Sequence, residues 1–118
     1  MEFKIIFYKD SSGKNLIEEF VSELAKSNRV LAAKIRQGIE KLRNRTYHRA
    51  PLSKYLEPNL WELRVSSGSH IARVVYTFRK NQLIILLHIF VKKQQKTPED
   101  ELIIARKRLK EVCEETKG

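Results

Sequence analysis

The chain of 118 residues is long enough for one domain with a single core and too short for two, so we expect one domain over residues 1–118. Its 24 Lys and Arg outnumber 14 Asp and Glu, and the formal net charge of +10 at pH 7 predicts a polyanionic partner, with nucleic acid the leading candidate. No membrane span or signal peptide is evident, which predicts a cytoplasmic protein, and the single cysteine, Cys113, excludes an internal disulfide.

The first half of the chain predicts a strand and a helical hairpin. Residues 2–9, EFKIIFYK, are rich in β-branched and aromatic side chains and lead into a turn, which is typical of a strand. Apolar residues at helical spacing then predict two helices, which SNR at 27–29 separates. Residues 46–59 contain two prolines and no period, and predict an irregular connection. The apolar positions are Leu16, Ile17, Phe20, Val21 and Leu24 in the first helix, and Leu31, Ile35, Ile39 and Leu42 in the second.

The second half predicts three strands and a helix. LWELRV at 60–65, HIARVVYTF at 70–78 and QLIILLHIFVK at 82–92 are separated by short turns, as in an antiparallel meander. Thr97 is expected to cap the last helix and Pro98 to occupy its first position. The order β-α-α-β-β-β-α predicts an α+β fold in which two N-terminal helices cover one face of an antiparallel sheet.

Side chains alternate between the two faces of a strand, which predicts what lies opposite the helical hairpin. Arg64 lies opposite the apolar set of its strand, and Arg73 does the same on the next strand. On the last strand we expect Leu86, His88, Phe90 and Lys92 on one face, with Leu87, Ile89, Val91 and Lys93 on the other. Arg64, Arg73, His88 and Lys92 can therefore converge on one surface. Arginines that are simply solvated, one of them paired with Glu62, are an equally open interpretation.

The positive charge is concentrated in the middle of the chain. Residues 26–97 carry 16 basic and 3 acidic side chains, whereas both ends are near neutral or acidic. A uniformly solvated surface would mix the two signs. The middle segment is therefore where we expect a functional site.

Four separated strings resemble a known family: LWELRV, ARVVYTF, LLHIFVKKQQKTP and EDELIIARKRLKE. In this order and spacing they resemble the HigB-like, phage-derived branch of the RelE/ParE superfamily of toxins from type II toxin–antitoxin systems. The similarity covers residues 51–112, and the preceding residues agree in element order only. It implies a RelE-like fold with a twisted antiparallel sheet and an activity as a translation-dependent mRNA endonuclease in the ribosomal A site.

The residue types fit this chemistry. Attack of a 2′-OH on the adjacent phosphorus requires proton removal, stabilisation of the charged phosphorane and protonation of the leaving 5′-oxygen. By resemblance, Arg64 and Arg73 are expected to grip the scissile phosphate, for which guanidinium forks are suited. His88 is either an acid–base group or a satisfied core residue, while His48 and His70 are weaker candidates. Lysines whose pKa is depressed by neighbouring cations are the other candidates for proton transfer: Lys92, Lys93 and Lys96.

Further residues are expected to bind RNA without taking part in the chemistry. Phe90 could stack on a base, although packing under the last helix is equally open. Basic residues on the second helix and the connection after it predict a surface for ribosomal RNA, whose loss should weaken binding rather than abolish cleavage. These residues are Lys34, Arg36, Lys41, Arg43, Arg45 and Arg49.

The resemblance also implies the partners. They are the ribosome with its mRNA and a small helix-turn-helix antitoxin, through which alone the toxin would reach operator DNA. No cofactor or metal is expected. The acids at 99–101 are expected to face away from the phosphate site. Two alternatives remain open, a ParE-type gyrase inhibitor and a non-catalytic phage-derived RNA-binding protein.

Overall fold

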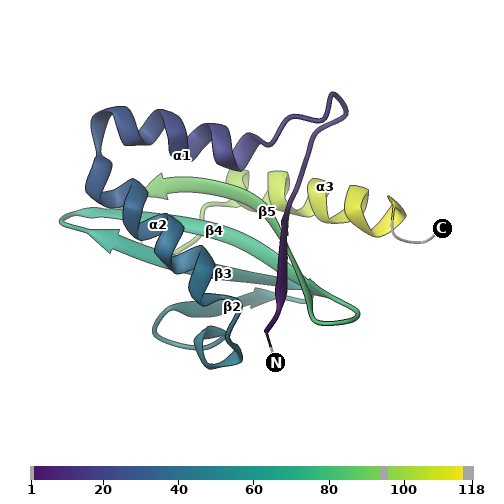
Figure 1. Cartoon of the computed structure of the whole chain (residues 1–118). Coiled ribbons are helices and arrows are strands. Elements are labelled where there is room, and N and C mark those ends of the chain that lie inside the picture. Colours follow the sequence, from purple (N-terminus) through teal and green to yellow (C-terminus); the bar gives the residue numbers. More distant parts are fainter. Residues whose placement is uncertain (1, 94–95, 116–118) are drawn as a thin grey trace.

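The structure of the chain, a computed structural model, describes residues 2–93 and 96–115 (Figure 1). In this described part, no helix is long and apolar enough to cross a membrane. The elements are β1 (Lys4–Phe7), α1 (Leu16–Ser27), α2 (Arg29–Lys41), the short 3-10 helix η1 (Arg45–Tyr47), β2 (Ser53–Glu57), β3 (Leu60–Ser67), β4 (His70–Arg79), β5 (Leu83–Lys92) and α3 (Glu99–Glu115).

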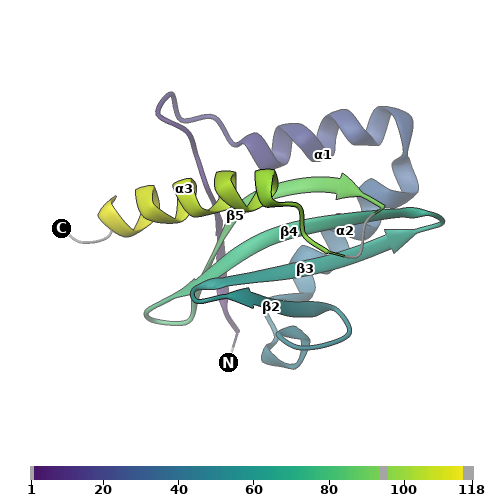
Figure 2. The ribbon, with the colours of Figure 1, turned by 180° about the vertical axis from the view of Figure 1, so that it is seen from behind.

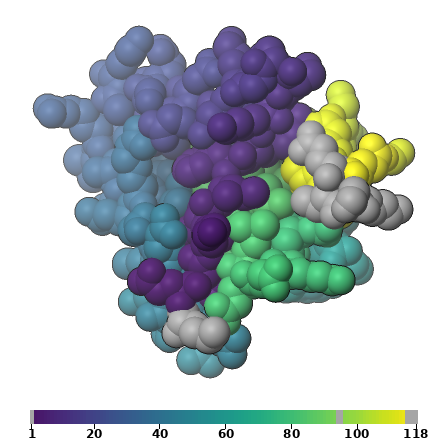
Figure 3. Space-filling view, turned by 45° about the vertical axis from the view of Figure 1, so that its right-hand side comes forward, coloured from purple at the N-terminus to yellow at the C-terminus, as the bar shows by residue number. Residues whose placement is uncertain are grey.

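The five strands form one sheet in the order β1-β5-β4-β3-β2. The predicted α+β fold is confirmed, as are the helical hairpin, the three-strand meander and the last helix. Two details of the sheet were predicted wrongly. β1 pairs parallel with β5, so the sheet is mixed, and Figure 3 shows the N-terminal residues beside those of β5 at the surface. Residues 53–57, expected in an irregular connection, form the edge strand β2 because they pair with β3.

The hairpin of α1 and α2 packs on one face of the sheet. Asn15 caps α1 by accepting a hydrogen bond from the Glu18 amide, and Asn28 ends α1 and caps α2 in the same way. The buried sides of both helices meet the apolar faces of β3, β4 and β5 in the larger core. α2 lies very close to β3 at Gly38, where an added Cβ would be 3.0 Å from Val65 Cγ2. A side chain at this position would require Val65 to shift by a few tenths of an ångström.

α3 covers the opposite face of the sheet, as Figures 1 and 2 show from the two sides. A second, smaller core lies between α3 and the sheet and includes Val75, Leu87, Phe90, Ala105 and Val112. The expected cap at Thr97 is wrong. α3 begins at Glu99, the Pro98 carbonyl accepts the first helical hydrogen bonds, and the Thr97 hydroxyl instead donates to Glu62.

A β-bulge in β5 changes the expected alternation of its side chains. Val75 of β4 pairs with His88, but the next residue, Tyr76, pairs with Leu86, so Leu87 is the extra residue. Leu86 consequently lies in the core under α1 and α2, and Leu87 lies under α3, the reverse of the prediction. The strand beyond the bulge follows the predicted alternation.

Candidate functional site

The two predicted phosphate-binding arginines are direct neighbours on the sheet. Arg64 of β3 and Arg73 of β4 are cross-strand partners, and Arg73 pairs on its other side with Phe90 of β5. Lys92 follows Phe90 on the same face of β5, two residues along the strand. Arg64, Arg73 and Lys92 therefore share the face of the sheet that α3 covers, as the period of two predicted, and we call these three residues the cationic row.

A buried carboxylate lies beside the two arginines. Glu62 is fully buried, and its Oε1 atom is 3.0 Å from Arg64 Nε and 4.0 Å from Arg73 Nη1. Its other oxygen accepts a hydrogen bond of 2.6 Å from the Thr97 hydroxyl, which joins the chain before α3 to β3. Arg64 is partly open to solvent, with 24% of its side chain exposed. We call Glu62, Arg64 and Arg73 the Glu62 cluster.

Arg73 is the least satisfied member of this cluster. Its side chain is fully buried, and none of its three nitrogen atoms has a hydrogen-bond partner among residues 2–93 and 96–115. Burial lowers the pKa of the guanidinium, and nearby Arg64 lowers it further, while the charge of Glu62 acts in the opposite direction. A buried cation with unused donors is unfavourable for folding, which points to a role other than stability. The sequence predicts Arg73 on a surface, and the full burial of its side chain corrects that expectation.

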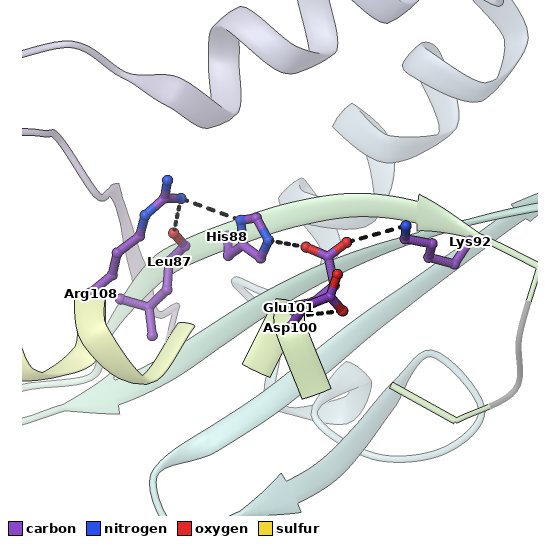
Figure 4. Close-up of polar contacts among 6 residues, drawn as sticks. All are labelled: Leu87, His88, Lys92, Asp100, Glu101 and Arg108. Carbon is purple, nitrogen blue, oxygen red and sulfur yellow. Dashed lines mark hydrogen bonds and ion pairs between the residues drawn. The ribbon is translucent and has the colours of Figure 1, made fainter. Parts of the chain in front are cut away.

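The start of α3 is tied to β5 by Glu101. This carboxylate lies 2.7 Å from His88 Nε2 through one oxygen and 3.7 Å from Lys92 Nζ through the other (Figure 4). The expectation that the acids at 99–101 all face away from the site is therefore wrong for Glu101, which is buried. Lys92 thus lies beside a carboxylate, a neighbour that the sequence did not predict.

His88 is enclosed between α3 and the sheet. Because a carboxylate accepts and a guanidinium only donates, Nε2 carries the proton given to Glu101, and Nδ1 faces Arg108 Nη1 at 3.4 Å (Figure 4). Arg108 also donates to the Leu87 carbonyl at 2.9 Å. Burial lowers the pKa of His88, against the opposing effect of Glu101. The histidine is therefore neutral at pH 7 and has both nitrogens occupied, as in the satisfied core alternative.

This arrangement predicts how stability depends on pH. The folded-state pKa of His88 is depressed, so the unfolded chain takes up a proton first, and stability falls as the pH drops below the unfolded value of about 6.5. One proton contributes a slope of at most about 1.4 kcal/mol per pH unit. Urea unfolding between pH 7.5 and 5 should show a shallower decline for His88→Gln. The control His70→Gln changes an exposed residue and should retain the wild-type slope, and equal slopes in all three proteins would contradict the assignment.

Other predicted site residues lie in different environments. Lys93 and Lys96 are exposed beyond the end of β5. Phe90 is buried under α3, 5.6 Å from the His88 ring, and so offers no open face for a base in this conformation. His48 packs between Phe3 and Phe78 and bonds the Leu42 carbonyl, which makes it a structural residue.

The predicted ribosomal RNA surface lies across the sheet from the Glu62 cluster. α2 and η1 are on the face opposite α3, and several of their basic side chains already have partners. Arg36 pairs with Glu18 at 2.9 Å and Arg43 with Glu40 at 2.7 Å. The remaining placements are Lys34 near the Ser66 carbonyl, Lys41 over the Tyr47 ring, Arg45 over Phe3 and Arg49 in the connection before β2.

Sequence reasoning missed Glu101 and Arg108, which hold His88 from α3. The spacing of seven residues, two helical turns, could have placed both on one side of the helix, but nothing in the sequence identified that side as facing β5. Among the described residues, no three His, Cys, Asp or Glu side chains lie together in a way that could hold a metal ion.

Taken with the fold, these contacts define a small α+β protein with a cationic row on the face of a mixed sheet that a C-terminal helix covers. The family model "Phage derived protein Gp49-like (DUF891)" matches residues 19–110, and the chain therefore belongs to this family. The family is associated with RelE-like toxin proteins. A search of curated proteins found no match. Assignment to the HigB-like branch stays a prediction.

Proposed function

We propose that the chain is the toxin of a type II toxin–antitoxin system and cleaves mRNA in the ribosomal A site. The observation that carries this proposal is the buried guanidinium of Arg73, which has no hydrogen-bond partner among the described residues and lies beside Arg64. A buried arginine with unused donors, next to a second arginine, suits a phosphate that gains charge during reaction. Family membership supports the toxin class, and the cationic row favours a nuclease over a gyrase inhibitor.

In the proposed reaction, the 2′-OH of one nucleotide attacks the adjacent phosphorus and the bond to the following 5′-oxygen breaks. Arg64 and Arg73 stabilise the charge of the phosphorane. Lys92 lies on the same face and is the best-placed proton-transfer group, with Lys93 and Lys96 close by in sequence. His88 acts by holding α3 in place, because both of its nitrogens are occupied. The chemistry needs no cofactor.

Arg73 reaches a phosphate only if the start of α3 moves. Figure 2 shows the chain just before α3 crossing in front of the sheet. The polar contacts that must open there include Thr97 to Glu62, Glu101 to His88 and the ion pair of Glu101 with Lys92. Hydrogen bonds to charged groups contribute about 1.5–3 kcal/mol each, an amount that binding to the ribosome can supply. We therefore propose that the free protein is closed and that the ribosomal complex opens it.

The proposed partners are those that the resemblance to RelE-like toxins implies, and the charge distribution supports where each would bind. Basic residues of α2 and η1 contact ribosomal RNA on the face opposite the Glu62 cluster, and their contribution depends on salt. An acidic segment of a cognate helix-turn-helix antitoxin neutralises the cationic row, and the toxin contacts operator DNA through that antitoxin.

Mapping RNA ends after brief induction in a bacterial host tests the proposal. We expect new 5′-hydroxyl ends within translated mRNAs, with 2′,3′-cyclic phosphates on the upstream fragments, because these are the products of 2′-OH attack. Arg64→Gln should reduce the number of these ends strongly. A DNA-damage response without cleaved mRNA would instead identify a gyrase inhibitor, and unaffected growth would favour a non-catalytic RNA-binding protein.

A further inference from the structure

A groove of about 540 Å³ runs along the edge of the sheet at β2. It does not include Arg73. Six polar or aromatic side chains line it, from the connection before β2, from β2 and from β3: His48, Arg49, Lys54, Tyr55, Trp61 and Arg64. We call it the β2 groove.

The β2 groove is cationic. Arg49, Lys54 and Arg64 line it, and no carboxylate of the described residues does. Arg49 and Lys54 are exposed, and their charged ends have no polar partner in the part of the chain that the structure describes. The charges of Arg49 and Lys54, which have no counter-charge among the described residues, attract an anion from solution. The groove therefore suits a negatively charged chain.

The same groove presents an aromatic surface. Tyr55 is 54% exposed, and its ring lies 5.5 Å from the half-buried Trp61 ring at an angle of 72°. Trp61 is held from behind by Phe78, with ring centroids 4.8 Å apart. A fixed tryptophan and an exposed tyrosine form a wall against which a flat ring can stack. Stacking of nucleobases on aromatic side chains tolerates any sequence, because every base has a π-face.

The groove connects the two faces of the sheet. Tyr55 pairs with Trp61, and Lys54 pairs with Glu62, so the aromatic pair and Lys54 lie on opposite faces of the edge strand β2. Arg64 lines the groove and also contacts Glu62. An extended ligand in the β2 groove would therefore run from the face of the sheet that carries α2 to the Glu62 cluster.

From these contacts we infer that the β2 groove binds single-stranded RNA, with one unpaired base against Tyr55 and Trp61 and the phosphates beside it on Arg49 and Lys54. This inference rests on the proposed function, because it places the groove beside the scissile phosphate. Duplex RNA fits it poorly, since paired bases hide the faces that the aromatic wall would contact.

The test separates binding from cleavage by using a short, unstructured, fluorescein-labelled RNA with 2′-O-methyl sugars, which cannot undergo 2′-OH attack. Fluorescence anisotropy at low salt measures its affinity for the whole chain. Tyr55→Ala is expected to weaken binding about 5- to 150-fold, the effect of losing one stacked base. Tyr55→Trp should retain binding. Lys54→Ala should reduce the slope of log affinity against log salt by about 0.7.

Two matched controls change the same residue types outside the groove. Tyr47→Ala removes an exposed tyrosine whose ring faces Lys41, and Lys107→Ala removes an exposed lysine of α3. Tyr47→Ala should bind as tightly as the wild type, and Lys107→Ala should leave the salt slope unchanged. No binding by the wild type, or equal losses in Tyr47→Ala and Tyr55→Ala, would overturn the inference.

Failure of this inference can be distinguished from failure of the nuclease proposal. If the wild type cleaves mRNA while Tyr55→Ala binds the methylated RNA normally, the inference that the β2 groove binds RNA is wrong and the nuclease proposal stands. If Tyr55→Ala loses binding but the wild type produces no new mRNA ends, the inference that the β2 groove binds RNA is supported and the proposed activity is wrong.

Discussion

Arg73→Met is expected to abolish mRNA cleavage and, at the same time, to make the protein more stable. The guanidinium is fully buried with no hydrogen-bond partner among the described residues, so an apolar side chain of similar length removes a desolvated charge. In the variant, Glu62 still has two partners, the Arg64 guanidinium at 3.0 Å and the Thr97 hydroxyl. We expect the free energy of unfolding to rise by about 1–3 kcal/mol. Cleavage should fall at least about 100-fold, as when one transition-state donor is lost.

The measurements are urea unfolding and the number of mRNA ends after induction. Arg79→Met is the matched control, because Arg79 lies on the same face of β4, near the far end of the strand, and contacts Cys113. It should retain cleavage. A clear loss of stability in Arg73→Met would show that Arg73 has a structural role. Normal cleavage by Arg73→Met would show that Arg73 does not belong to the proposed site.

Glu62→Ala is expected to have the largest effect on stability. The substitution leaves two neighbouring cations without their carboxylate and the Thr97 hydroxyl without its acceptor. Breaking a buried ion pair by removing one partner destabilises a protein by about 3–5 kcal/mol, a large part of the stability of a domain. Chemical denaturation measures this loss directly.

The control for Glu62→Ala is Glu57→Ala on the neighbouring strand. Glu57 pairs with Arg106 at 2.8 Å, but both side chains are substantially exposed, so its loss should lower stability by less than about 1 kcal/mol. The double variant Glu62→Ala with Arg73→Met should recover part of the lost stability, because it also removes the buried cation. Similar losses in Glu62→Ala and Glu57→Ala would show that Glu62 is not the counter-charge of the cluster.

The period of two predicted the cationic row correctly because it is a local property of each strand. Arg64 and Arg73 each lie on the face of their strand opposite the apolar side chains. Because the apolar side chains face the larger core, the two arginines must share the other face. The same rule failed at Leu86 and Leu87, since a bulge adds one residue to the strand without a local signal. β2 was missed for a related reason: its residues are held by pairing with β3, whereas the segment around them has two prolines and no period.

Burial of the site could not be predicted from the sequence. A pattern of charges on a strand shows which face they share, but it does not show what covers that face. The covering contacts come from α3, where Glu101 reaches His88 and Arg108 reaches the Leu87 carbonyl. These contacts join segments that are distant along the chain, and they depend on how the helix is rotated about its axis.

The pairing of β1 with β5 sets the order in which the fold can form during synthesis. Lys4 is the partner of Leu83, so β1 cannot pair with β5 until most of the chain has left the ribosomal tunnel. Lys92, at the end of β5, emerges after that partner. A nascent chain thus lacks both its finished sheet and its cationic row until late in translation.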